Sequence, residues 1–180
     1  MHLFYTPELK GEFHILDEQE SKHCTLVLRM QEGDKVMLSN GKGSMFRAEL
    51  VNADPRRCEL RVIEELIPAG KGVGTFGKKN YSLHVGIAPT KNINRFEWFL
   101  EKATEIGIDE ITPLICRRSE RKVVKTERLN KVITAAMKQS EKAYHPLLNE
   151  ACSMKEILSQ DLTGQKFIAY VEEGEYPSLK

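Results

Sequence analysis

The chain has 180 residues and a mass of 20.6 kDa, enough for one ordinary domain or two small ones. Its 27 Lys and Arg residues almost balance its 26 Asp and Glu residues, and this formal charge of +1 excludes both a histone-like polycation and an acidic disordered tail. The hydrophobic content of 41% predicts a soluble globular protein. No apolar run approaches the roughly 18 residues of a membrane span, and no export signal is expected at the N-terminus.

The first seventy residues predict a small β-barrel with one helix. The helix is expected over residues 18–30, where Cys24, Val27 and Leu28 recur at helical spacing before Gly33. Glycines in the segment 40–43 supply the positive φ of a hairpin turn. Short strands separated by turns are typical of a barrel, and we expect them over residues 3–5, 12–16, 35–39, 44–50 and 58–63.

Beyond residue 80 the pattern changes to alternating strands and helices. Residues 81–88 form a nearly continuous apolar run, typical of a strand buried in a parallel sheet. The next helix carries an apolar stripe from Phe96 to Ile106, with Asn94 and Glu97 as a capping pair and Gly107 as its end. We expect further strands over 111–116 and 166–171, and a helix that Thr126 caps and that extends through Met137.

The sequence therefore predicts two domains, residues 1–70 and 81–180, joined by a linker over 71–80. The linker glycines of residues 72–77 fit GxGxxG and, with Lys78, GxxxxGK. A phosphate site needs a strand before such a motif and a helix after it, whereas here a strand follows, which favours a plain linker. Three predicted strands leave the second sheet incomplete at Lys180, because a buried parallel strand needs neighbours on both sides.

Metal and nucleophile chemistry have little support in the sequence. The cysteines, at positions 24, 58, 116 and 152, are at least 34 residues apart, so they form no CxxC pair, and reduced thiols indicate the cytoplasm. The five histidines show neither HxxxH nor HExxH spacing, and no GxSxG elbow occurs, so we expect no metal. Glu101 and Glu105 are one turn apart and are expected on the wet face of their helix.

Charge is segregated along the chain although its total is small. Residues 117–128 hold six basic and two acidic side chains, whereas residues 150–180 hold three basic and six acidic ones. A basic cluster of this kind can bind phosphates with a strong salt dependence, as nucleic-acid-binding proteins do. A lone charge run is more often a solvated surface, but Lys71, Lys78 and Lys79 form a second basic segment that favours nucleic acid.

Three blocks of sequence resemble the RsmE family. They are HCTLVLRM at 23–30, FEWFLEKATEIGI at 96–108 and ITPL at 111–114, with Arg118 and Ser119 following. Lys91, the Glu-Arg-Leu of residues 127–129 and the Gln-Ser of 139–140 match as well, in order along nearly the whole chain. Two positions depart from the family, which usually has arginine where His2 stands and often has one after the Gln-Ser.

The resemblance implies a PUA-like RNA-binding barrel followed by a SPOUT-type α/β domain with a trefoil knot, working as a homodimer. It implies methylation of the N3 position of a uridine in 16S ribosomal RNA of the small ribosomal subunit, with S-adenosyl-L-methionine as cofactor, and no membrane or metal. Family members continue with a GPEGG-type loop and an LGxRILRxETA-type segment, which are not in this sequence. We therefore expect the 180-residue chain alone to be inactive.

The site residues also follow from the resemblance and the charge pattern. RNA contacts are expected from Arg29, Lys91, Arg117, Arg118 and Arg121, although Arg29 could equally form an ion pair between barrel and helix. Cofactor contacts are expected from Glu172 and Glu173, after the third predicted strand. The sequence identifies no catalytic base. The alternatives are a non-catalytic RNA-binding or ribosome-assembly module and, more weakly, a nucleotide-binding enzyme that uses the linker glycines.

Overall fold

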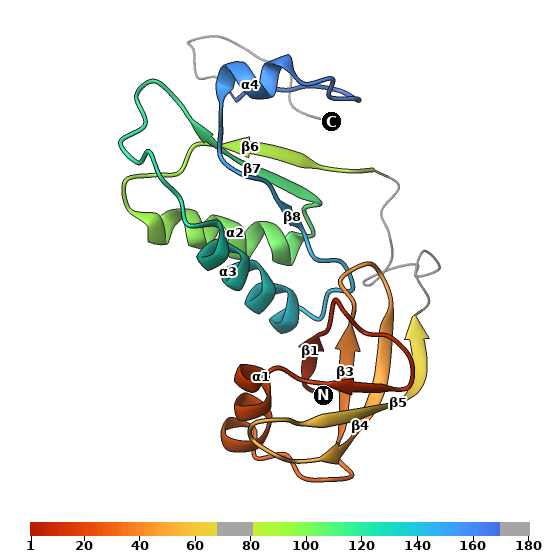
Figure 1. Cartoon of the computed structure of the whole chain (residues 1–180). Helices are drawn as coiled ribbons and strands as arrows, with labels where there is room; N and C mark the ends of the chain where they lie inside the picture. The colour runs from red at the N-terminus through yellow and green to blue at the C-terminus, as the bar shows by residue number, and fades with distance from the viewer. Residues whose placement is uncertain (68–80, 170–180) are drawn as a thin grey trace.

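The computed structural model describes residues 1–67 and 81–169, and it contains two β-sheets with helices packed beside them (Figure 1). The linker glycines and the two proposed cofactor residues, Glu172 and Glu173, lie outside the described residues. We call residues 1–67 the half-barrel unit and residues 81–169 the α/β unit.

The half-barrel unit is a curled five-stranded sheet. Its strands are β1 (Leu3–Tyr5), β2 (Phe13–Ile15), β3 (Lys35–Ser39), β4 (Met45–Asn52) and β5 (Glu59–Ile67). Their order in the sheet is β1-β3-β4-β5-β2, with β1 parallel to β3 and every other pair antiparallel. The expected strands are therefore present, in a sheet whose two edges are β1 and β2.

The turn between β3 and β4 follows from local chemistry. Gly41 and Gly43 have φ values of 70° and 102°, a region that side chains with a Cβ rarely occupy. The side-chain oxygen of Asn40 accepts hydrogen bonds from the backbone N–H groups of Lys42 and Ser44. The predicted hairpin is thereby confirmed.

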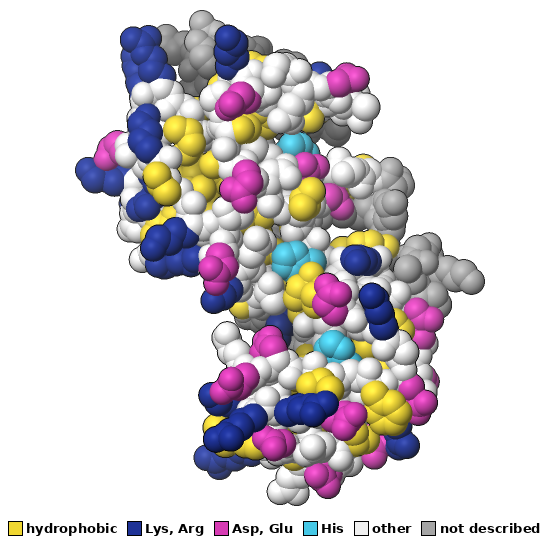
Figure 2. All heavy atoms as spheres, viewed as in Figure 1, with side chains coloured by type: hydrophobic (Ala, Val, Ile, Leu, Met, Phe, Trp, Pro, Cys, Tyr) yellow, Lys and Arg dark blue, Asp and Glu magenta, His cyan; other side chains and the backbone are white. Residues whose placement is uncertain are grey.

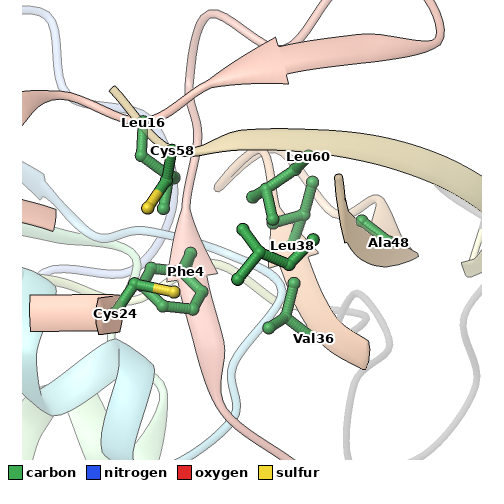
Figure 3. Close-up of a cluster of buried hydrophobic side chains, with 9 residues drawn as sticks. Phe4, Leu16, Cys24, Val36, Leu38, Ala48, Cys58 and Leu60 are labelled. Atoms are coloured by element: carbon green, nitrogen blue, oxygen red, sulfur yellow. The ribbon is translucent and has the colours of Figure 1, made fainter. Parts of the chain in front are cut away.

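Alternate residues of the strands point inward and form a closed apolar core. Figure 3 shows how these side chains meet beneath the curled sheet. Full burial of such side chains stabilises a fold by about 1.5–3 kcal/mol each. The core consists of Phe4, Leu16, Cys24, Val36, Leu38, Ala48, Leu50, Cys58 and Leu60.

The helix beside this core is shorter than expected. The helix α1 (Glu18–Lys22) begins at Asp17, whose carboxylate accepts from the N–H of Glu20, and it continues into the π-helical turn η1 (His23–Val27). Arg29 then takes a left-handed φ of 55°, so the chain leaves the helix before it. The predicted single helix over 18–30 is wrong in this last part because of the wide turn and the left-handed residue.

The α/β unit contains a parallel sheet. Its strands are β6 (His84–Ile87), β7 (Glu110–Ile115), β8 (Leu147–Leu148) and β9 (Cys152–Ser153), and β7 pairs with each of the other three. The first strand is shorter than the predicted 81–88. Residues 166–169, the described part of the predicted third strand, lie in no strand, and Phe167 and Ile168 are exposed instead of paired with a neighbour.

Two long helices cover one face of this sheet, and a short helix lies at the other (Figure 1). The helix α2 (Ile93–Ile106) ends at Gly107 with a φ of 99°, as predicted, but its cap is Asn92 instead of Asn94. The helix α3 (Thr126–Gln139) begins at Thr126, so its N-cap is the extended residue Lys125, one residue before the predicted cap. The short helix α4 (Met154–Ser159) begins with a capping box.

The two units meet where the β3–β4 hairpin contacts the segment after α3, and we call this contact the junction. The carbonyl of Ala143 accepts from the N–H of Gly43 at 2.9 Å and from the hydroxyl of Ser39 at 3.2 Å. The N–H of His145 donates to the carbonyl of Gly41 at 2.9 Å. At the other side, the Lys138 ammonium on α3 contacts both carboxylate oxygens of Glu20 on α1 at 2.8 Å.

Candidate nucleic-acid interface

The carboxyl ends of β6 and β7 point to one edge of the parallel sheet, since the two strands run in the same direction. The loop of residues 88–92 follows β6 and leads into α2, and the loop of residues 116–125 follows β7 and leads into α3. We call these two loops the carboxyl edge. Open α/β sheets bind their ligands at such an edge, where consecutive loops form a crevice.

The fold brings four of the five predicted RNA-binding residues to the carboxyl edge. Lys91 lies in the first loop, and Arg117, Arg118 and Arg121 lie in the second. Figure 2 shows a row of Lys and Arg side chains along the side of the α/β unit where these loops lie. Residues that are up to 30 positions apart in the sequence thus form one basic surface.

Arg121 joins the two loops of this edge. Its Nη2 donates to the carbonyl of Lys91 at 2.8 Å, and its Nε donates to the carbonyl of Thr90 at 3.3 Å. A guanidinium presents several donors in one plane, so it can hold two adjacent carbonyls at once. Arg121 therefore positions the edge and has fewer donors left for a ligand.

The other three predicted residues at this edge differ in whether their side chains already have a partner. The Lys91 ammonium contacts a carboxylate oxygen of Glu120 at 2.9 Å, in an exposed pair of the kind that contributes little to stability. Arg117 and Arg118 are exposed, and no described carboxylate or carbonyl accepts a hydrogen bond from either side chain. These two guanidinium groups are available to phosphate oxygens, which they can bind through two parallel hydrogen bonds.

Arg29 lies apart from the carboxyl edge. It follows η1 on the half-barrel unit, near the C-terminal end of α3, whereas the edge precedes the N-terminal end of that helix. Its side chain is exposed and forms no ion pair with any residue of 1–67 or 81–169, so the alternative of a barrel–helix ion pair is wrong for the described part of the chain.

A further cation was missed from the sequence. Arg95 lies in the first turn of α2, is exposed, and follows Lys91 by four residues. Its place in the first turn of α2 puts it next to the loop of residues 88–92, and a search for basic residues just after Lys91 could have found it. The neighbouring Arg128 is not free, because its Nε and Nη2 bind the two carboxylate oxygens of Glu97 at 2.6 and 3.1 Å.

The described residues do not enclose a cofactor at the carboxyl edge. Cavities of about 260 Å³ and about 290 Å³ both lie between the half-barrel unit and the α/β unit, and neither is lined by a residue of the edge. The described residues contain no group of three or more His, Cys, Asp or Glu side chains that could hold a metal ion. Of the helices in residues 1–67 and 81–169, none has the length and hydropathy of a membrane span. Glu101 and Glu105 share the Lys102 ammonium on the surface of α2, which confirms their predicted place.

The chain is similar to known RNA methyltransferases in both units. Residues 77–180 match the sequence model of the RNA methyltransferase domain, and residues 16–63 match that of the RNA methyltransferase PUA domain. Ribosomal RNA small subunit methyltransferase E from Aquifex aeolicus is 28% identical over 146 residues, which cover 79% of this chain. The chain spans 59% of that relative's length.

Solved structures show the same arrangement of elements. A probable rRNA-methyltransferase from Porphyromonas gingivalis is 35% identical with a TM-score of 0.79, and the match covers 96% of this chain and 70% of that one. Ribosomal RNA small subunit methyltransferase E from Neisseria gonorrhoeae, bound to S-adenosyl methionine, is 21% identical with a TM-score of 0.77, over 91% of this chain and 67% of that one. The predicted fold class, a PUA-like barrel followed by a SPOUT-type α/β unit, is confirmed.

Proposed function

The chain belongs to the RNA methyltransferase family, whose model its residues 77–180 match, and from this membership we propose that it serves the methylation of uridine N3 in 16S ribosomal RNA of the small subunit. The cofactor of the proposed reaction is S-adenosyl-L-methionine. The observation that carries the proposal beyond family membership is the carboxyl edge, where Arg117 and Arg118 are exposed without a described partner. Glu172 and Glu173 remain proposed contacts of the cofactor.

The chemistry divides into a methyl donor and the work left to the protein. S-adenosyl-L-methionine, when bound, supplies a methyl group on a sulfonium, which is already a strong electrophile. The uridine nitrogen must lose its proton and lie in line with the methyl group, so the protein has to hold an unpaired base in one orientation. In the described part of the chain, the groups proposed to hold the RNA backbone, and through it the base, are basic side chains. They are Arg29, Lys91, Arg95, Arg117 and Arg118.

The hydrogen bonds of Arg121 support a rigid placement of the basic groups at the carboxyl edge. Arg121 ties the loop of Lys91 to the loop of Arg117 and Arg118, so the phosphate-binding groups keep a fixed spacing. A backbone held at fixed points limits where the adjacent base can lie, which is how positioning contributes to a reaction rate. Arg121 is therefore proposed as a positioning residue for the RNA.

The proposed working form is a homodimer in the cytoplasm. In its support, α2 exposes Trp98 and Ile106, which are 62% and 81% accessible, on a helix surface that no described element covers. Exposed large apolar side chains on one surface are typical of a protein–protein contact. Sedimentation of the protein and of Trp98→Glu tests this: a dimer that the substitution splits is expected, and a monomeric wild type would contradict it.

The first experiment is mass spectrometry of nucleosides from small-subunit RNA, with and without the gene. Loss of N3-methyluridine on deletion is expected. If the modified nucleoside persists, the methylation proposal fails and a non-catalytic RNA-binding module becomes the better account.

The second experiment tests the carboxyl edge. Arg118→Ala is expected to weaken RNA binding and to lower the slope of log K against log salt by about one, as for one lost phosphate contact. Lys155→Ala, on the exposed surface of α4, removes the same charge elsewhere and is the matched control. If the two variants change RNA affinity and salt slope equally, Arg118 contributes only its net charge and makes no specific phosphate contact.

A further inference from the structure

A cavity of about 290 Å³ opens at the junction, apart from the carboxyl edge, and we call it the junction pocket. Its lining combines residues from both units. Tyr5 and Lys42 come from the half-barrel unit, Asn130 comes from α3, His145 comes from the segment that leads into β8, and Leu147 is the first residue of β8. No residue predicted from the sequence for RNA or cofactor binding lines it.

His145 is fixed in one neutral form in this pocket. Its Nδ1 lies 2.9 Å from the carbonyl of Pro146, which can only accept, so Nδ1 carries the proton. Its Nε2 lies 3.0 Å from the hydroxyl of Thr134, which therefore donates. Burial lowers the pKa of His145, so the ring is uncharged at neutral pH. Both ring nitrogens are occupied, so the ring can offer a ligand only its flat surface.

Tyr5 adds a second aromatic surface. Its ring stacks on that of His145 with a centroid distance of 4.8 Å and an interplanar angle of 18°. The backbone of Gly41 packs against it so closely that a Cβ there would lie 2.6 Å from Cε2 of Tyr5. The hairpin therefore holds the aromatic pair in place, and a pre-ordered pair can stack on a ligand with little loss of side-chain entropy.

Two polar side chains at the rim of the pocket have no partner among residues 1–67 and 81–169. Lys42 is exposed and pairs with no described carboxylate. The side-chain amide of Asn130 makes no hydrogen bond with a described residue, although it has two donors and an acceptor. Leu147 is 57% exposed beside them and adds an apolar surface. A flat aromatic pair, an amide and an ammonium together match a base, its polar edge and a phosphate.

We propose that the junction pocket binds one unpaired nucleotide of an RNA strand, with its base on the aromatic pair, its polar edge at Asn130 and its phosphate at Lys42. The inference rests on the proposed function, because that function supplies the RNA. Asn130 follows Lys125, the last residue of the carboxyl edge, by five residues, a rise of about 8 Å along α3. One strand can therefore contact both the edge and the pocket, which would anchor the RNA on both units.

The test measures binding of the chain to a fluorescein-labelled six-nucleotide oligouridine by fluorescence anisotropy. The double variant Lys42→Ala/Asn130→Ala is expected to bind about fivefold more weakly and with a salt slope lower by about one. The matched control is Lys155→Ala/Asn52→Ala, which changes the same residue types at exposed positions outside the pocket. Equal affinities of the double variant and its control would overturn the proposal.

Two further measurements test where the base stacks and whether it belongs to an RNA strand or to a free nucleotide. An oligonucleotide with one 2-aminopurine is expected to lose fluorescence when it stacks in the pocket, and Tyr5→Leu is expected to weaken binding by about 5- to 140-fold and to restore that fluorescence. Circular dichroism checks whether Tyr5→Leu is folded. If this variant is unfolded, the result for Lys42→Ala/Asn130→Ala decides whether the pocket binds the nucleotide. Uridine monophosphate that binds as tightly as the oligonucleotide would mean a site for free nucleotides and would overturn strand binding. A failed methylation proposal shows separately, as N3-methyluridine that persists after gene deletion.

Discussion

The half-barrel unit and the α/β unit bury their strands to different extents. In the half-barrel unit, Val36 and Leu38 of β3 are fully buried, and the strands on both sides pack on the same core. In the α/β unit, β7 has neighbours on both sides and four buried residues in a row, whereas β6 has no fully buried residue. Among the described residues β6 has one neighbouring strand and β7 has strands on both sides, which favours the deeper burial of β7.

The two faces of the parallel sheet also differ in what packs on them. The face toward α2 and α3 carries the second core, in which Leu100, Ile111 and Ile133 are fully buried. The other face carries a chain of polar contacts: the Asn149 amide donates to Glu110 at 2.6 Å and to Thr112 at 2.8 Å, and Thr112 contacts His84 at 2.7 Å. The half-barrel unit is thus stabilised by a closed core, whereas the α/β unit combines one apolar face with a second face on which these polar contacts lie beside the buried Leu114 and Ile157.

The largest expected effect tests the closed core. Leu38→Ala in β3 should lower the free energy of unfolding by about 3–5 kcal/mol, because the residue is fully buried and the cavity cannot collapse fully. Leu158→Ala on α4, where the side chain is 72% exposed, should change it by less than about 0.5 kcal/mol. Urea unfolding measures both. Similar losses for the two variants would mean that the face at α4 is as closely packed as the half-barrel core.

The next effect tests the junction between the units. At Gly43 an added Cβ would lie 2.5 Å from Oη of Tyr144, at a φ of 102°. Gly43→Ala should therefore cost about 2–4 kcal/mol, from the left-handed backbone and the overpacking together. Gly11→Ala is the matched control, since Gly11 has a φ of 74° with no atom within 4 Å of the added Cβ, and it should cost only about 1–2 kcal/mol. Equal losses in urea unfolding would show that Tyr144 moves away freely.

The local signals in the sequence predicted the elements well. The two glycines of the 40–43 turn and Gly107 act within their own turns, so their positions predicted the hairpin and the end of α2 correctly. Caps were predicted one or two residues away from their true places, because Asn92 competes with Asn94 and both can accept the same kind of N–H bond. The strand expected over 166–171 failed in its described part, since periodicity cannot tell whether a partner strand is present.

The sites were predictable only in part. Charge pattern and resemblance indicated the basic residues that the fold collects at the carboxyl edge. They could not distinguish Arg118 from Arg121, because the bonds of Arg121 reach carbonyls 30 and 31 positions away. The junction pocket has no sequence signal at all, since Tyr5 and His145 are 140 residues apart and meet only through the packing of the two units.

A smaller effect tests the hydrogen-bonded face of the parallel sheet. Thr112→Val removes the hydroxyl that Asn149 and His84 contact, and it should cost about 1–2 kcal/mol because two polar groups lose a partner. Thr163→Val, at an exposed position, is the control and should cost nothing measurable. Hydrogen exchange should also rise at β8, which the Asn149 bonds hold beside β7. Unchanged exchange there would assign the stability of β8 to its backbone bonds alone.

The smallest effect compares one histidine of the junction with one of the half-barrel unit. Burial lowers the pKa of both His145 and His14 below the ordinary value of 6.5. Below pH 6.5 the unfolded chain therefore takes up protons that the folded chain resists, and the free energy of unfolding falls as the pH falls, by at most about 1.4 kcal/mol per pH unit and per histidine. Above pH 6.5 both states are neutral and neither histidine contributes a slope.

Urea unfolding between pH 7.5 and 5.5 separates the two contributions. His145→Asn should lose less stability over this range than the wild type, and His14→Asn should reduce the loss independently, because the two side chains lie in different units and their effects should add. A pH profile of His145→Asn identical to that of the wild type would mean that His145 takes up its proton as readily in the folded as in the unfolded chain, and the neutral form of the stacking surface would then be lost below pH 6.5.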